Sequence, residues 1–383
     1  MNSNLKVFLG TFVLMVGFGC KKDIPEQKAK TDTEILNTYL TIPAKPFNYQ
    51  SPELPSFFTN QFIKIQDNTP STNRTTDWGA TLGRVLFYDK IVSKNQTIAC
   101  ASCHLQQFGF TDTAQFSRGF SGGSTKRHSM SLINATYYLN GRFFWDERAS
   151  TLEDQVLMPI QDDVEMGMTL DSLVNRIQKK EYYPILFRQA FGNSAITTEA
   201  ISKAMAQFLR SMVSFQSKYD LGRTITADRN ADFPNFTQEE NIGKKIFMTH
   251  KKVNCSACHN TDVFIMDNPR NNGLSFTNPD VGIFIHSAKQ GDIGRFKTPS
   301  LKNVALRARF MHDGSLSSLD AVLNHYNMGM QPNPNLDAHL IDINGQPSQM
   351  NLTTLEIKAL KAFLETLTDT KIIADEKFSS PFR

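Results

Sequence analysis

A five-residue motif, Cys-x-x-Cys-His, occurs twice in this sequence and constrains it more than any other feature. The two copies are Cys100-Ala-Ser-Cys103-His104 and Cys255-Ser-Ala-Cys258-His259. Two thiols at this spacing can bond to the two vinyl groups of one haem, and the His that follows can ligate its iron. The chain of 383 residues has only five cysteines, so two chance matches are very rare. We therefore predict two covalently bound haems of the c type.

Two other kinds of site use the same cysteine spacing. A thioredoxin-like redox pair needs only Cys-x-x-Cys, but it does not require the following His, and neither copy lies in a βαβ pattern. A zinc site could take ligands from both pairs, yet the pairs are about 150 residues apart and each brings its own His. Haem attachment is the interpretation that accounts for both histidines.

Length and charge bound the remaining possibilities. A chain of 383 residues is long enough for two domains of ordinary size, one for each motif. Lys and Arg exceed Asp and Glu by only four and form no basic run, so the sequence does not predict nucleic-acid binding. Haem attachment uses four of the five cysteines and leaves Cys20.

The first twenty residues have the pattern of an export signal. Lys6 precedes an apolar run over 7–18 that is too short to span a membrane securely. Gly19-Cys20 resembles a bacterial lipoprotein cleavage site, which implies a lipid on Cys20, although Gly17 stands where Leu is usual. Simple cleavage and an uncleaved anchor are the alternatives. Since covalent haem attachment also requires export, we expect a periplasmic protein.

The chain divides where its pattern changes. The expected segments are a signal peptide at 1–20, a tether at 21–55, a first haem domain at 56–220, a second haem domain at 221–370 and a tail at 371–383. The tether is polar and rich in Pro. The domain boundary is placed near 219–235, where Pro234, Asn residues and charges interrupt the apolar pattern.

Apolar residues recur at helical spacing in several segments, and strand patterns are few. The expected helices are 77–87, 171–178, 199–215, 237–247, 319–326 and 352–364. Thr237 and Glu240 have the spacing of a capping box before the second motif. The stretch 106–127 is rich in Gly, Ser and Thr and is typical of a long loop. We predict a mostly α protein with two cytochrome c-like haem domains.

The residues around the motifs decide what the haems can do. An iron with ligands on both faces only transfers electrons, whereas an open face can bind peroxide, whose cleavage needs a group that moves a proton. Glu165, in the apolar stretch 164–168, is a candidate, though a Glu there is more often a surface or capping residue. Trp145 could carry an electron between haems or be a core aromatic. Candidates for a distal ligand of the second haem, or else packing residues, are Tyr326, Met328 and Met330.

Taken in order over 78–368, these motifs resemble the bacterial dihaem cytochrome c peroxidases, a family that includes the MauG-type dihaem enzymes. The resemblance implies that the haem on the first motif is the peroxidatic one and that the haem on the second motif transfers electrons. The family's Phe-Trp-Asp-Gly-Arg motif, whose Trp bridges the haems, matches 144–148 and gives Trp145 that role, with Glu147 in place of Gly. The family's catalytic Glu, in Glu-Met-Gly, matches Glu165, and an active-site Gln ten residues earlier matches Gln155.

The chain departs from ordinary members of that family in three places. Counting fourteen residues from His312, the usual distal Met of the second haem is Tyr326, as in MauG-type members. A phenolate stabilises ferric and higher iron, so this ligand favours storing oxidising equivalents. The His that blocks the peroxidatic iron in members requiring reductive activation is missing from 106–127, which implies an open iron unless His128 reaches it. His128 also replaces a calcium-ligating Asn whose companions are the carbonyls of Arg307 and Arg309, so calcium stays open.

The resemblance thus implies a peroxidase that reduces hydrogen peroxide to water with electrons from a small cytochrome or similar donor. Peroxide would bind opposite His104, with Glu165 moving the proton, Gln155 positioning it and Trp145 passing electrons. Tyr326 supports an alternative, a MauG-like oxidase that uses peroxide to modify a partner protein. A third interpretation, a non-catalytic electron carrier, is opposed by Glu165 and Gln155. A homodimer is left open.

Overall fold

The structure, a computed structural model, describes residues 29–383 together with Met1, Lys6 and Gly10. The chain separates into two units, Met1–Thr31 and Asp32–Arg383, and the second unit is described below. Cys20 and most of the predicted signal peptide lie outside the described residues, so export and lipid attachment stay predictions. Among the described helices, none has the length and apolar character needed to cross a membrane.

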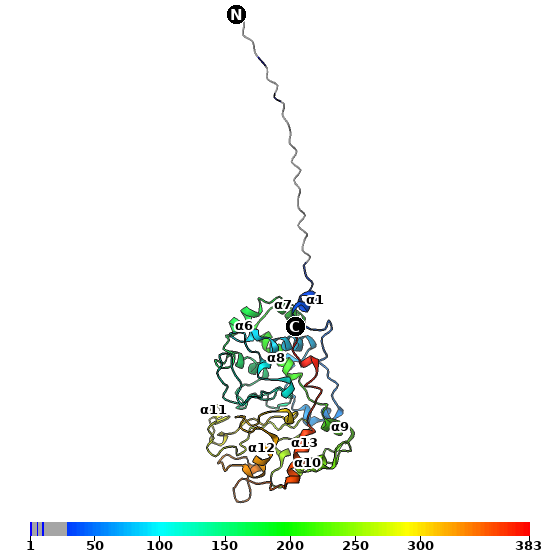
Figure 1. Cartoon of the computed structure of the whole chain (residues 1–383), viewed down its shortest axis with the longest axis vertical. Coiled ribbons are helices and arrows are strands. Elements are labelled where there is room, and N and C mark those ends of the chain that lie inside the picture. The colour runs from blue at the N-terminus through cyan, green and yellow to red at the C-terminus, as the bar shows by residue number, and fades with distance from the viewer. Residues whose placement is uncertain (2–5, 7–9, 11–28) are drawn as a thin grey trace. The chain divides into compact units, whose positions relative to one another are not determined.

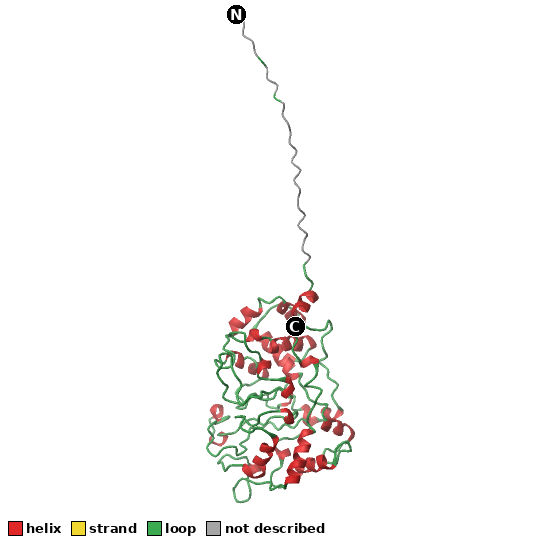
Figure 2. Cartoon of the chain, viewed as in Figure 1, coloured by secondary structure: helices red, strands yellow, loops and turns green. Residues whose placement is uncertain are grey.

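Helices joined by long loops build the second unit, and its residues form isolated bridges but no β-strand (Figure 2). The mostly α class is therefore confirmed. The α-helices are α1 (Asp32–Tyr39), α2 (Gln61–Lys64), α3 (Asp77–Tyr88), α4 (Leu152–Gln155), α5 (Met158–Gln161), α6 (Leu170–Ile177), α7 (Tyr182–Phe191), α8 (Thr198–Arg210), α9 (Lys218–Ile225), α10 (Gln238–Thr249), α11 (Phe284–Ser287), α12 (Leu319–Asn324) and α13 (Thr354–Glu365).

The main helices begin where the sequence supplies a cap. Thr76 caps α3 by accepting a hydrogen bond from Gly79 N. Thr237 and Glu240 form the predicted capping box at the start of α10. Such caps satisfy backbone N–H groups that have no partner within the helix. They explain why the helices before both haem motifs could be predicted within two residues.

Two predicted helices end earlier than expected. The helix expected over 199–215 stops at Arg210, because the backbone of Met212 and Ser214 bonds to Asn134 instead of continuing the helix. The helix expected over 319–326 ends at Asn324 and widens into a π-helical turn, His325–Gly329. α7 and α9 were not predicted, and α9 occupies the start of the stretch expected to be a boundary.

Two hydrophobic cores fill the unit. The first is built from residues 40–213, joined by four residues from later in the chain, and the second from residues 219–367. In Figure 1, α6, α7 and α8 lie at one end of the unit, and α10, α12 and α13 lie at the other. Cys100 packs against the first core and Cys255 against the second. Each core therefore supports one motif.

One helix crossing dominates each core. α3 packs on α8 in the first core, and α10 packs on α13 in the second. Both crossings need a glycine, because a Cβ on Gly83 would overlap Ala204 O and a Cβ on Gly243 would overlap Ala359 O. α3 and α10 are the helices that precede the two motifs. These close contacts therefore position the chain just before each motif.

The two halves repeat the same local structure. Asn134 and Asn303 both have a left-handed backbone, with φ of 63° and 58°. Asn134 N donates to Met212 O, and Asn303 N donates to Leu367 O. Their side-chain oxygens accept hydrogen bonds from Ser214 N and Asp369 N. The bridges Phe143–Ala149 and Phe310–Leu316 follow at matching places. The motifs therefore sit in an internal structural repeat that the sequence did not make evident.

Both ends of the unit fold against the first core. From Asp32 on, the predicted tether is folded, since it forms α1 and buries Leu40 and Tyr49. The predicted tail is folded too, because Phe378 is buried and its carbonyl accepts a hydrogen bond from the Tyr88 hydroxyl (2.6 Å). Figure 1 places the C-terminus beside the helices of the first half.

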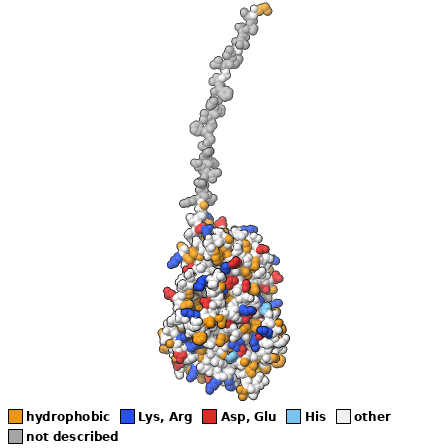
Figure 3. Space-filling view, turned by 180° about the vertical axis from the view of Figure 1, so that it is seen from behind, with side chains coloured by type: hydrophobic (Ala, Val, Ile, Leu, Met, Phe, Trp, Pro, Cys, Tyr) orange, Lys and Arg blue, Asp and Glu red, His pale blue; other side chains and the backbone are white. Residues whose placement is uncertain are grey.

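The surface carries charges of both signs. Figure 3 shows Lys and Arg side chains interspersed with Asp and Glu on this face of the molecule. The formal net charge is +4. On this face there is no field of a single sign of the kind that attracts nucleic acid.

Substitution of Gly83 tests the crossing of α3 and α8. We expect Gly83→Ala to lower the free energy of unfolding by about 1–3 kcal/mol, because overpacking a close contact costs that much. Gly291→Ala is the control, since nothing lies within 4 Å of its added Cβ, and it should change stability by less than about 0.5 kcal/mol. Denaturant unfolding of the haem-loaded protein gives both values, and equal losses would contradict the close crossing.

Candidate functional site

The first motif lines a cavity of about 960 Å³, the first cavity. All residues predicted for the peroxidatic haem line it together, namely Cys100, Cys103, His104, Trp145, Gln155 and Glu165. His104 Nδ1 lies 3.0 Å from Phe110 O and 3.3 Å from Ser129 Oγ. Contacts at Nδ1 fix the ring orientation and leave Nε2 as the nitrogen for a metal.

A tight turn after α5 holds Glu165 at the first cavity. Asp162 Oδ1 accepts hydrogen bonds from Val164 N (2.8 Å) and Glu165 N (2.9 Å). Phe120 N donates to Glu165 O (2.9 Å), which ties the turn to the loop after the first motif. Gly167 has a φ of 60°, and a Cβ there would overlap the Phe120 ring. The Glu-Met-Gly sequence thus makes a compact turn that presents Glu165.

The environment of Glu165 suits proton transfer. Burial raises the pKa of Glu165, the neighbouring Asp162 carboxylate raises it further, and Arg148 lowers it. A carboxyl group with a raised pKa can both accept and return a proton near neutral pH. Gln155 ends α4, which is fixed to α8 by a two-pronged ion pair from Arg210 to Glu153 (2.6 and 2.9 Å).

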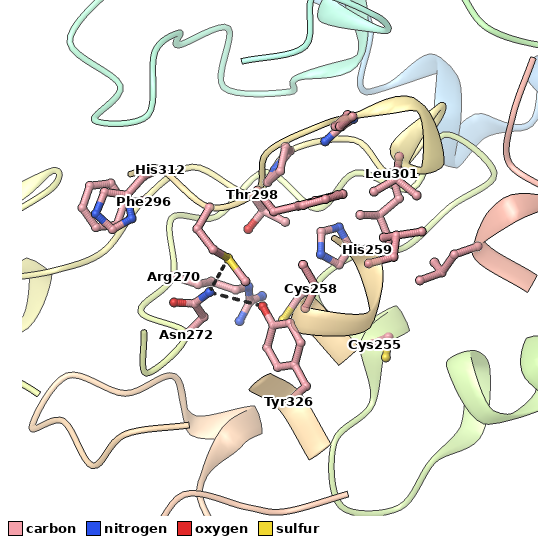
Figure 4. A pocket seen from close by; sticks show the side chains of 18 of the residues that line it. Cys255, Cys258, His259, Arg270, Asn272, Phe296, Thr298, Leu301, His312 and Tyr326 are labelled. Atoms are coloured by element: carbon pink, nitrogen blue, oxygen red, sulfur yellow. Dashed lines mark hydrogen bonds between the residues drawn. The ribbon is translucent and has the colours of Figure 1, made fainter. Parts of the chain in front are cut away.

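The second motif lines a separate cavity of about 190 Å³, the second cavity. Figure 4 shows the His259 ring and the Tyr326 hydroxyl in this cavity, with Cys255 and Cys258 nearby. Tyr326 lies in the π-helical turn after α12, a wider turn that is frequent at functional sites. Of the other candidate ligands, Met328 is 65% exposed, and Met330 is buried in the second core without lining the cavity.

Two residues of the second cavity were missed by the sequence analysis. Asn272 Nδ2 lies 3.3 Å from the Tyr326 hydroxyl and 3.2 Å from Met311 Sδ (Figure 4 draws both contacts). Met311 has a φ of 71°, a strained value for a non-glycine residue. Met311 directly precedes His312, which served in the sequence only to locate Tyr326 fourteen residues later. No spacing in the sequence pointed to Asn272.

The donors of both cavities fit a c-type haem. The four motif thiols are free of disulfides. In the second cavity, Arg270 Nε and Arg307 Nε are buried without a hydrogen-bond partner among the described residues, and burial lowers the pKa of Arg307 to about 10. The other nitrogens of these two side chains are partly used, since Arg270 pairs with Asp337 and Arg307 donates to backbone carbonyls. Buried guanidinium N–H groups that lack an acceptor suit an anionic group, such as the carboxylates of haem. Arg118, Lys126 and Arg127 line the first cavity.

A shared wall separates the two cavities, and Trp145 lies in it. The residues that line both cavities are His128, Ser129, Met130, Ser131, Trp145, Lys297 and His312. Trp145 Nε1 donates to His128 O (2.7 Å). Lys297 N donates to Trp145 O, and His128 N donates to His312 O, both at 2.8 Å. These bonds fix Trp145 between the two motifs.

Ion pairs brace the rim of the first cavity. Arg127 bonds to both carboxylate oxygens of Asp280 (2.6 and 2.8 Å) and to Asp146 (2.6 Å), and Asp146 also accepts from Arg148 (2.9 Å). The two guanidinium groups hold the pKa of Asp146 below its usual value despite burial. His312 stacks on Phe296, with ring centroids 3.6 Å apart (Figure 4).

His128 is buried and its ring contacts the loop after the first motif. Its Nδ1 lies 3.2 Å from the carbonyls of Ala114 and Gln115, and its Nε2 is buried without a partner among the described residues. The next residue, Ser129, bonds to Cys103 O on the His104 side. No group of three or more His, Cys, Asp or Glu side chains that could hold a metal ion occurs in the described part of the chain.

Comparisons with known proteins agree with this geometry. A model of the di-haem cytochrome c peroxidase family matches residues 78–226. The chain is 32% identical to the methylamine utilization protein MauG of Methylophilus methylotrophus over 78% of this chain and 84% of that protein. It is 29% identical to cytochrome c551 peroxidase of Nitrosomonas europaea over 76% of this chain and 79% of that protein.

A solved structure is similar over most of this chain. It is the crystal structure of a MauG-like protein associated with microbial copper homeostasis, with a TM-score of 0.74 and 30% identity. The match covers 86% of this chain and 99% of that one.

Proposed function

Because this chain belongs to the di-haem cytochrome c peroxidase and MauG family, we propose that it reduces hydrogen peroxide to water with electrons from a small cytochrome or similar donor protein. One observation carries the proposal: Glu165 and Gln155 line the same cavity as the first motif. The family carries two c-type haems, and both motifs of this chain have the cysteines and the His to hold them.

The reaction needs a proton to move between the two oxygens of peroxide. A haem held by Cys100, Cys103 and His104 would supply the redox chemistry for peroxide reduction. Glu165 accepts the proton of the bound peroxide and returns it to the leaving oxygen, so that water departs. The Gln155 amide orients the peroxide by hydrogen bonding.

Electrons reach the first cavity through Trp145. This indole lines both cavities and is fixed by hydrogen bonds at its ring nitrogen and its carbonyl. The fully oxidised protein would react with peroxide without prior reduction. The position of His128 supports this. Its ring contacts the backbone carbonyls of Ala114 and Gln115, and the next residue, Ser129, bonds to Cys103 O on the His104 side of the cavity.

The cellular context follows from the predicted signal. The protein is exported to the periplasm and held at the membrane by a lipid on Cys20. Its two haem domains divide near residue 220, in keeping with the two separate cores. Calcium and a homodimer stay open.

Glu165→Gln tests the proton step. We expect the reaction of the fully oxidised protein with one equivalent of peroxide to slow by about 10²–10⁴-fold, the usual value of general acid–base catalysis. Stopped-flow haem absorption measures the rate, while a chemical reductant should still reduce both haems. Asp163→Asn, a neighbouring acid on the same cavity, is the control and should keep the wild-type rate.

Three outcomes of that experiment count against parts of the proposal. A wild-type rate in Glu165→Gln excludes Glu165 as the proton carrier. A reaction that starts only after one haem is reduced contradicts the reaction of the fully oxidised protein. If neither the oxidised nor the reduced protein reacts with peroxide, the protein is a non-catalytic electron carrier.

The pH dependence of the peroxide reaction reports the pKa of Glu165. The carboxylate accepts the proton, so the rate should fall as the pH drops through a pKa that lies above the usual carboxyl value of about 4.3. Asp162→Asn keeps the Oδ1 acceptor but removes a negative charge that raises this pKa. Its acid limb should therefore move to lower pH in the same stopped-flow assay. An unmoved limb would show that another group is titrating.

Tyr326 favours a second function, a MauG-like oxidase that uses peroxide to oxidise a side chain of a partner protein. Tyr326 lines the second cavity with His259, whereas Met328 is exposed and Met330 is absent from that cavity. We infer that Tyr326 is the distal ligand of the second haem. A phenolate ligand lowers the potential and makes this haem a poor acceptor of electrons from a cytochrome.

Tyr326→Met tests the ligand. We expect a higher reduction potential of the second haem, because Met ligation raises the potential relative to an anionic oxygen ligand. Spectroelectrochemical titration of the haem-loaded protein measures it. Met328→Leu is the matched control and should leave the titration unchanged. A shift in the control but not in Tyr326→Met would assign the ligand to Met328.

A further inference from the structure

Two aromatic side chains, Trp145 and Tyr138, are placed so that each could give an electron to an oxidant in the first cavity. Both line that cavity, but only Trp145 also lines the second. Tyr138 is buried, with 4% of its surface exposed. An oxidant in the first cavity could therefore draw an electron from either ring, and the protein needs a means of choosing.

Lys297 holds a positive charge against one of these rings. Its Nζ lies 4.0 Å from the centroid of the Tyr138 ring. The ammonium pairs with Asp267 (2.6 Å) and Glu147 (3.2 Å), and the Lys297 side chain is 1% exposed. The Lys297 backbone N donates to Trp145 O. The same residue thus holds Trp145 by its backbone and faces Tyr138 with its charge.

The surroundings of Tyr138 oppose its oxidation. A cation over an aromatic face is attracted to the neutral ring and repelled by the oxidised one. Here the Lys297 ammonium offsets the negative charges of Asp267 and Glu147, which also act on Tyr138 and would otherwise favour its oxidation. Oxidation of a phenol also releases its proton. The Tyr138 hydroxyl accepts a hydrogen bond from Ser300 N (3.2 Å), and no described residue accepts its proton. Burial raises the pKa of Tyr138, so the phenol keeps that proton.

The surroundings of Trp145 favour its oxidation. Trp145 Nε1–H donates to the backbone carbonyl of His128 (2.7 Å). An indole that has lost one electron can keep this proton, and a hydrogen bond from a charged donor is stronger than one from a neutral donor. Trp145 therefore has a partner for the charge that oxidation creates, and Tyr138 has none.

We propose that Lys297 is a positioning residue that keeps Tyr138 reduced and so directs one-electron oxidation to Trp145. The inference rests on the proposed peroxidase function, which supplies the oxidant. Peroxide takes up two electrons and two protons and becomes two waters. Both electrons come from the donor protein of the proposed function and both protons from solvent. Each electron passes through the Trp145 indole, which is oxidised and then reduced again without breaking a bond in its ring.

Glu147, one of the two acids that pair with Lys297, supports this role. Glu147 has a left-handed backbone with a φ of 56°, and its counterpart in the structural repeat is Gly314, with a φ of 63°. A glycine would adopt this conformation without strain. The chain instead holds a carboxylate there, which accepts from Lys297 and from Asn140 Nδ2 (3.0 Å). The ammonium group of Lys297 is thus held in place by two carboxylates, those of Glu147 and Asp267.

Rapid-freeze EPR of the haem-loaded protein, mixed with one equivalent of peroxide, tests the inference. We expect no tyrosyl radical in the wild type or in Lys297→Arg, which keeps the charge. Lys297→Met leaves the Asp267 and Glu147 carboxylates without their cation, so that a carboxylate can take up the phenol proton. This variant should therefore give a tyrosyl radical, and adding Tyr138→Phe should remove it. Lys302→Met is the matched control, because Lys302 is equally buried and paired with Asp220 but lines neither cavity. It should give no tyrosyl radical.

The outcomes separate this inference from the proposed function. A Lys297→Met protein that binds both haems and reacts with peroxide, yet gives no tyrosyl radical, overturns the inference alone. A wild-type tyrosyl radical that Tyr138→Phe removes also overturns it, and this arm does not depend on the folding of the Lys297 variants. A wild type whose haem spectrum never responds to peroxide overturns the proposed function and the inference together.

Discussion

Two backbone hydrogen bonds at the wall between the cavities hold the two halves in register. Lys297 N donates to Trp145 O and His128 N donates to His312 O, so each half donates to the other through its backbone. Trp145 Nε1 adds a bond to His128 O. Backbone bonds are the least sensitive to side-chain change. The placement of the two motifs relative to each other therefore tolerates side-chain changes at these bonded positions.

The internal repeat explains why these bonds come as a pair. The residues at corresponding places are His128 and Lys297, Asn134 and Asn303, Phe144 and Met311, Trp145 and His312, and Glu147 and Gly314. The backbone is alike at these places, whereas the side chains differ in chemistry. One scaffold therefore carries two different centres, and their separate functions arise from substitutions at equivalent positions.

Local signals in the sequence were sufficient for the motifs and for the main helices. The Thr237 capping box and the apolar spacing of α3 act within a few residues, so a linear reading finds them. The exact motif spacing likewise identified the cysteines. The family resemblance pointed to Glu165 and Gln155, and the fold brings both to the first cavity.

Contacts between segments that lie far apart in the chain could not be predicted from local sequence patterns. Phe378 has polar neighbours in the sequence, yet it packs in the first core. Asn272 meets Tyr326 only because the irregular loop after the second motif folds across the cavity. Tyr326 could not be separated from Met328 and Met330 by spacing, because a π-helical turn decides which of them faces inward. Lys297 had no local signal at all.

The buried charges at the wall are not explained by stability. Taking ions out of water costs several kcal/mol each, and well-packed apolar residues in place of a buried ion pair are often as stable or more stable. The left-handed backbone of Glu147 adds roughly 1–2 kcal/mol. Asp267 and Glu147 nevertheless hold Lys297 at 1% exposure between the two cavities. An arrangement that costs stability at this wall is best accounted for by an electrostatic role. Lys297 faces the Tyr138 ring and bonds to the backbone of Trp145, and these are the two rings that an oxidant in the first cavity would reach.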